Sequence, residues 1–96
     1  MKEDKIMTLH PLGKKGVNIS LAKYEQVKKF ILDTIRTKKE ITFELLTDLA
    51  VSKLEGKLEG KIMWYVVTVK LDLEARKIIE RIPGSSPHKL RLAKPT

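Results

Sequence analysis

The feature that most constrains the fold of this chain is a helix-period apolar segment that runs directly into a predicted β-hairpin. Apolar residues recur at helical spacing between Ile62 and Arg76. A short strand from Ile78, a Pro- and Gly-containing turn at 83–87 and a second strand at 88–92 follow at once. A helix that feeds a hairpin in this way is suited to present a reading helix and a basic loop to nucleic acid.

Two further helices are predicted upstream of this segment. The first begins after Ser20, because a serine at the N-cap accepts a hydrogen bond from an otherwise unpaired amide. The second spans Phe43 to Leu54, with Thr42 as its cap, and the stretch around Ile41 reads as a third short strand. We therefore expect an α+β fold of the winged-helix type, a three-helix bundle with a C-terminal two- or three-stranded β wing (residues 78–92).

The chain divides into three predicted parts. Residues 1–19 are interpreted as an N-terminal arm, because the turn-forming residues of 10–16 precede only a short extended lead-in. Residues 20–92 are assigned to the winged-helix domain and residues 93–96 to a tail. A length of 96 residues fits one small domain.

Composition points to a cytoplasmic protein that does not use the membrane. The chain has no cysteine, which excludes disulfides and thiolate metal sites. Its N-terminus lacks the apolar core of a signal peptide, and the longest apolar run, Ile62 to Val67, is too short to span a bilayer. The formal net charge is +8, and a surface of that sign attracts phosphates without sequence preference.

Catalytic and cofactor signatures are missing from the sequence. His10 and His88 are the only histidines, and neither stands at a metal-ligand spacing. The segment Gly13 to Gly16 offers backbone amides to an anion but lacks the spacing of a nucleotide-binding loop. No nucleophile–base set or paired carboxylates rise above chance. We expect no enzymatic activity, no cofactor and no metal.

Two segments carry a resemblance to known proteins. Residues 69–81 look like the end of the reading helix and the first wing strand of bacterial and archaeal winged-helix regulators, and residues 40–45 resemble the entry into their second helix. Such regulators usually carry Gly where this chain has Lys77. The whole chain, including 13–20 and Trp64-Tyr65, is more similar to a small, uncharacterised winged-helix family. The wider resemblance implies a DNA-binding transcriptional regulator.

That reading assigns candidate contacts to duplex DNA. The predicted reading helix would enter the major groove with its polar side chains, and the wing would hold phosphates, because the chain from Arg81 onward contains no acidic residue. Strand alternation places Lys89 and Arg91 on one face, where Arg81 is expected to join them beside the turn serines. The candidates are Lys61, Thr68 and Lys70 in the helix; Arg81, Ser85, Ser86, Lys89 and Arg91 in the wing; and Lys14 and Lys15 in the arm as possible phosphate contacts.

The outer face of the same helix argues against base-specific reading. A helical wheel places Ile62, Val66, Val69 and Leu73 toward the core, with Tyr65 at their border. The opposite face carries Trp64, Val67, Thr68, Leu71 and Ala75, where a reading helix would offer long polar side chains, and Asp72 is expected to oppose phosphate.

Three accounts of this apolar face stay open. Arm residues Ile6, Leu9, Leu12 and Val17 would cover it; a second copy or another protein would dock on it; or it would meet nucleic acid through apolar contacts. The second account gives the alternative function, a protein-interaction or dimerisation module centred on Trp64, Val67 and Leu71.

Overall fold

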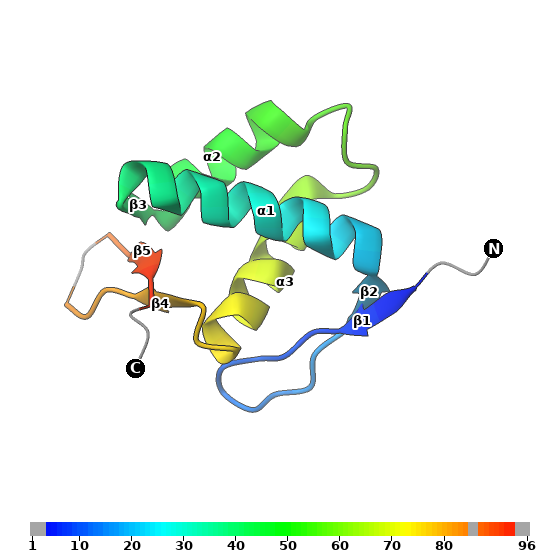
Figure 1. Ribbon diagram of the computed structural model, residues 1–96, viewed down its shortest axis with the longest axis horizontal. Helices are drawn as coiled ribbons and strands as arrows, with labels where there is room; N and C mark the ends of the chain where they lie inside the picture. Colours follow the sequence, from blue (N-terminus) through cyan, green and yellow to red (C-terminus); the bar gives the residue numbers. More distant parts are fainter. Residues whose placement is uncertain (1–3, 85–86, 94–96) are drawn as a thin grey trace.

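The computed structural model of the chain describes residues 4–84 and 87–93. Within them the chain folds into an α+β arrangement of three helices and two small antiparallel sheets, as expected at that level. Figure 1 labels the elements in chain order. They are β1 (Lys5–Met7), β2 (Asn18–Ser20), α1 (Leu21–Lys38), β3 (Glu40–Thr42), α2 (Phe43–Leu54), α3 (Ile62–Ala75), β4 (Ile79–Arg81) and β5 (Lys89–Leu92).

The predicted caps start the first two helices. The Ser20 hydroxyl accepts a hydrogen bond from the Lys23 amide at 3.3 Å, and the Thr42 hydroxyl accepts one from the Leu45 amide at 3.1 Å. Each bond satisfies one of the amides that the first helical turn leaves unpaired. Helix α3 begins after Lys61 without a side-chain cap, so its position depends on packing.

The third strand predicted around Ile41 is present. Strands β3, β5 and β4 lie side by side in that order, all antiparallel, with Ile41 opposite Leu90. Ile79 of β4 is also buried, so one face of this sheet packs on the core. The predicted tail begins at Ala93, whose amide donates to the carbonyl of Ile78 at 3.0 Å, and residues 94–96 lie outside the described residues.

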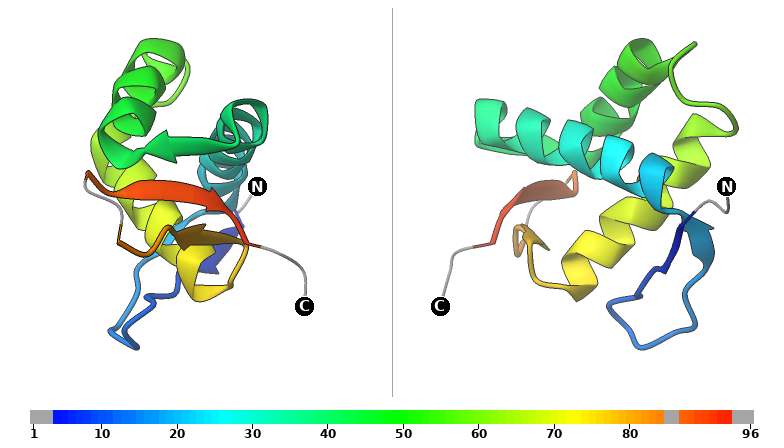
Figure 2. Two further views of the ribbon diagram at one scale, coloured as in Figure 1. Left: turned by 90° about the vertical axis from the view of Figure 1, so that its left-hand side faces the viewer. Right: turned by 45° about the vertical axis from the view of Figure 1, so that its right-hand side comes forward.

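Helix α3 runs through the middle of the molecule and packs against both α1 and α2 (Figure 2). The inward stripe predicted for this helix is confirmed, because Val66, Val69 and Leu73 are fully buried. Leu58, in the connector between α2 and α3, is also buried and fixes that connector to the core.

The arm folds back on itself instead of leading straight into α1. Strands β1 and β2 pair antiparallel, and this hairpin lies near the opposite end of α1 from the three-stranded sheet (Figure 1). Beyond β1, the Thr8 hydroxyl donates to the carbonyl of Val17 and accepts from its amide, both at 3.0 Å. The loop between the strands is therefore closed at its base.

The turn after α3 adopts a backbone conformation that favours glycine. Lys77 has a φ of +62°, in the left-handed region, while its amide donates to the carbonyl of Glu74 at 3.0 Å. We expect Lys77→Gly to raise the free energy of unfolding by about 1 kcal/mol, because glycine pays no Cβ penalty there. Urea unfolding followed by circular dichroism measures the change. Lys77→Ala keeps the Cβ and should bring no such gain; an equal gain would locate the effect in the lost charge.

Candidate functional site

The outer face of α3 exposes a group of large apolar side chains. Met63, Trp64 and Val67 are 47%, 44% and 36% exposed. Because residues three and four apart share one side of a helix, these three lie together. We call Met63, Trp64 and Val67 the α3 patch. The sequence analysis predicted that Trp64 and Val67 form an interface, but it did not include Met63. The position of Met63 next to Trp64 in the sequence could have indicated it.

Contacts beneath the patch hold Trp64 in place. Its ring packs edge-on against the ring of Tyr65, with centroids 5.1 Å apart. Tyr65 lies against Gly60, where a Cβ would come within 3.0 Å of the tyrosine ring. On the α1 side, the Lys23 ammonium lies 5.4 Å from the centre of the Tyr65 ring. The Trp64 indole therefore packs on Tyr65, which is itself held by contacts with Gly60 and Lys23.

The arm covers the neighbouring part of the same helix face. A cavity of about 90 Å³ between the arm and α3 is lined by Leu9, Lys15 and Val17 on one side and by Thr68 and Leu71 on the other, together with further arm residues. The first account of the apolar face is thus correct for Thr68 and Leu71. It is wrong for Trp64 and Val67, which stay exposed, and for Leu12, which points outward at 76% exposure.

This arrangement brings two predicted phosphate contacts together. Lys15 of the arm and Thr68 of α3 line the same small cavity, whereas Lys14 is exposed on the loop. Lys61 is exposed just before the first turn of α3. Along α3, Lys61 therefore precedes the α3 patch, and Lys15 lies beside Thr68 and Leu71, which follow it.

Asp72 does not face outward, and that prediction is wrong. Its side chain is fully buried, and one carboxylate oxygen accepts the Tyr24 hydroxyl at 2.5 Å while the other accepts the Leu9 amide at 2.8 Å. The Arg76 Nε, one helical turn on, donates at 2.9–3.0 Å. Burial, the hydrogen bond to Asp72 and its charge together raise the pKa of Tyr24 well above its usual range. Asp72 is thus the anchor that joins the arm, α1 and α3.

Lys70 is not exposed either, although it was predicted to contact DNA. Its residue is 7% exposed, and the ammonium lies 2.6 Å from a Glu74 carboxylate oxygen. The same ammonium stands 5.1 Å from the centre of the Phe43 ring at the start of α2. The approach of α2 encloses this side of α3, so the Lys70 charge is used inside the fold and is not offered to a phosphate.

His88 is partly buried and not a simple turn residue. Its ring stacks on Phe43 with centroids 6.0 Å apart, and among the residues that the structure describes its Nε2 has no hydrogen-bond partner. Burial lowers the pKa of His88, and the nearby charges of Lys70 and Arg81 lower it further, although Glu74 acts in the opposite direction. The native state therefore favours the neutral imidazole.

This environment predicts an acid sensitivity of the fold. Below pH 6.5 the unfolded chain binds a proton at His88 that the native state resists, so the free energy of unfolding should fall on acidification through that range. For one proton the slope is at most about 1.4 kcal/mol per pH unit. Urea unfolding at pH 5, 6 and 7 measures it. His88→Gln should flatten the profile, and a profile that stays unchanged in His88→Gln would contradict the assignment.

Two of the cations predicted for the wing form ion pairs with carboxylates across the three-stranded sheet. Arg91 Nε lies 2.6 Å from a Glu80 oxygen, and the Lys89 ammonium lies 3.8 Å from a Glu40 oxygen. Arg81 stands opposite the buried Leu90 in the strand register, so it lies on the other face from Lys89 and Arg91, contrary to expectation. It is nevertheless exposed at the strand end. Ser85 and Ser86 lie outside the described residues.

The described residues hold neither a cluster suited to a metal ion nor a helix suited to a membrane. In residues 4–84 and 87–93, no group of three or more His, Asp or Glu side chains is placed to hold a metal ion. Over the same ranges, no helix has both the length and the apolar character needed to cross a membrane.

Comparison with known proteins places the chain in a family. The sequence profile described as a family of unknown function (DUF6958) matches residues 5–90, which include the β1–β2 hairpin, all three helices and most of the three-stranded sheet. The chain belongs to this family. No curated protein and no solved structure gives a significant match. The expectation of a small uncharacterised family is confirmed, and DUF6958 membership carries no activity with it.

Proposed function

We propose that this chain is a winged-helix protein-interaction domain that docks an acidic protein partner on the outer face of α3. The order α1, β3, α2, α3, β4, β5 and the antiparallel order β3–β5–β4 support the winged-helix reading, as does the resemblance of residues 40–45 and 69–81 to winged-helix regulators. Winged helices serve protein recognition as well as DNA recognition, and the apolar residues exposed on α3 support the first of these.

The α3 patch is the observation that carries the proposal. Met63, Trp64 and Val67 stand exposed together although the arm covers Thr68 and Leu71 beside them. Exposed apolar groups of this kind mark docking surfaces, and tryptophan is prominent among the residues that dominate binding energy. Base-edge reading would instead need long polar side chains at these positions.

Charge around the patch indicates the kind of partner. Lys61 stands just before the first turn of α3, and Lys15 lines the cavity beside Thr68 and Leu71, in a chain of net charge +8. A second copy would bring the same cations together, and like charges across an interface disfavour association. A partner with an apolar segment rimmed by Asp or Glu would meet the face with complementary charge.

A peptide selection tests this proposal. Random 12-residue peptides displayed on phage are selected on the immobilised protein, and enriched sequences are synthesised. We expect apolar residues flanked by carboxylates, with Trp64 fluorescence reporting binding because it is the only tryptophan. Trp64→Ser should weaken the peptides by about 30-fold in titration calorimetry. Val51→Ser, which removes an exposed apolar side chain from α2, is the matched control. Peptides that bind Trp64→Ser as tightly as the wild type would overturn the proposal.

A second candidate, weak binding to duplex DNA, is supported by three exposed cations. Lys14, Lys61 and Arg81 have no ion-pair partner among the residues that the structure describes. In a salt-titrated shift assay with a random 30-base-pair duplex, replacing all three by Gln should reduce the salt slope by about one unit per lost contact. Failure to shift the duplex at 50 mM salt would remove this candidate.

A further inference from the structure

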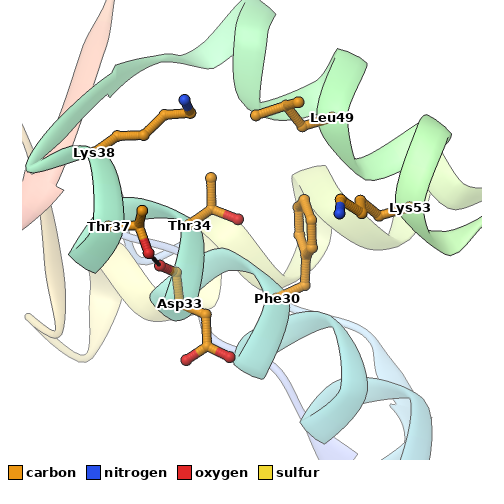
Figure 3. A pocket seen from close by; sticks show the side chains of 7 residues that line it. All are labelled: Phe30, Asp33, Thr34, Thr37, Lys38, Leu49 and Lys53. Carbon is orange, nitrogen blue, oxygen red and sulfur yellow. Dashed lines mark hydrogen bonds between the residues drawn. The ribbon is translucent and has the colours of Figure 1, made fainter.

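A groove between α1 and α2 lies apart from the α3 patch and has no part in the functions above. It has a volume of about 460 Å³, within the range of ligand sites. Figure 3 shows its side chains, of which Phe30 from α1 and Leu49 from α2 form the apolar walls. Both residues are only partly buried, so the apolar surface faces the open space.

Two lysines reach over this apolar surface from different helices. Lys38 extends from the last turn of α1 toward Leu49, and Lys53 extends from α2 toward the Phe30 ring (Figure 3). Neither ammonium has an ion-pair partner among the described residues. The Thr34 hydroxyl, which also lines the groove, adds a hydrogen-bond donor between them.

Among the described residues that line the groove, Asp33 carries the only carboxylate, and it does not neutralise these lysines. Asp33 turns its carboxylate away from the space (Figure 3), toward Lys29 at 3.6 Å and Arg36 at 3.2 Å. Its charge is thus balanced on the outer side of α1. The groove combines an apolar wall with two unpaired cations, which is complementary to an apolar anion.

We propose that the α1–α2 groove binds a small organic carboxylate with an aromatic or branched aliphatic body. The body packs between Phe30 and Leu49, and the carboxylate lies between Lys38 and Lys53. A small molecule fits better than a docked helix, because the lining spans about two turns of α1 and one of α2. A helix about 10 Å wide needs a longer surface to form a stable interface.

The test uses 2-naphthoate, with 2-naphthamide as its uncharged match, in amide proton–nitrogen NMR titrations of the full chain at fixed ionic strength. We expect naphthoate to shift residues 30–38 and 49–53 with a dissociation constant on the order of 0.1–1 mM. Naphthamide should bind at least about tenfold more weakly.

A double substitution locates the charge contacts. Lys38→Gln with Lys53→Gln should weaken naphthoate by about tenfold or more, whereas the control pair Lys5→Gln with Lys57→Gln removes the same charge elsewhere and should leave it within about twofold. Equal binding of the amide, shifts scattered over other lysines, or full affinity in the Lys38/Lys53 variant would each overturn the proposal. The last result would mean that these lysines serve only the helix ends.

Discussion

Replacing Asp72 with Ala is expected to lower the free energy of unfolding by about 3 kcal/mol. The substitution removes the acceptor of three donors at once: the Tyr24 hydroxyl, the Leu9 amide and the Arg76 guanidinium. Tyr24 is 2% exposed, so its hydroxyl would lose its partner inside the core. A buried donor without an acceptor costs free energy because water cannot replace the lost bond.

The same substitution should free the arm. Leu9 is held to α3 through the Asp72 carboxylate, 63 residues away along the chain. Without that bond, the cavity lined by Lys15, Thr68 and Leu71 should open and the Leu9 amide should exchange faster with solvent. Urea unfolding measures the stability loss, and hydrogen exchange by NMR measures the release of Leu9.

Asp33→Asn provides the matched control. Asp33 also has cationic partners, Lys29 and Arg36, but its side chain is 53% exposed. An exposed ion pair contributes little, so the expected loss is below about 1 kcal/mol. Asp72→Asn keeps the side-chain shape and one accepting oxygen, and should fall between the two. A loss in Asp72→Ala no larger than that in Asp33→Asn would show that the carboxylate does not hold the arm.

Local chemistry explains why much of the fold could be predicted from sequence. Ser20 and Thr42 cap their helices through bonds to amides three residues on, and such signals need no tertiary context. The inner stripe of α3 follows from the period of its apolar residues. The strand at Glu40–Thr42 could be predicted from the short extended stretch around Ile41. Its pairing with β5 could not be predicted, because that pairing depends on how the whole chain folds.

The candidate site was predicted less well, because polar residues are placed by long-range contacts. Lys70 and Asp72 are charged residues on one helix, and a helical wheel considers that helix alone. It therefore could not predict that α2 encloses Lys70 and that the arm encloses Asp72. Glu74 and Arg76 stand four residues after Lys70 and Asp72, and this spacing could have indicated that the two charges are paired within the helix. The cross-strand partners of Lys89 and Arg91 depended on a register that the sequence did not define.

Replacing Gly16 with Ala is expected to lower the free energy of unfolding by about 2–4 kcal/mol, or to detach the arm if the remaining domain stays folded. A Cβ at this position would stand 1.7 Å from the carbonyl oxygen of Thr8. The obstacle is backbone, so no change of rotamer relieves it. The loop would have to open and break the bonds between Thr8 and Val17, at 2.8–3.0 Å, that close its base.

Gly13→Ala separates this steric clash from the general cost of replacing a glycine that has a positive φ. Gly13 has a φ of +76°, but a Cβ there would meet no atom within 4 Å. Its replacement should therefore cost only about 1 kcal/mol, the ordinary penalty of the left-handed region. Urea unfolding compares the two variants, and the NMR shifts of Thr68 and Leu71 report whether the arm has left α3. If Gly16→Ala costs no more than Gly13→Ala and those shifts stay in place, then the close approach of Gly16 to Thr8 does not hold the arm on α3.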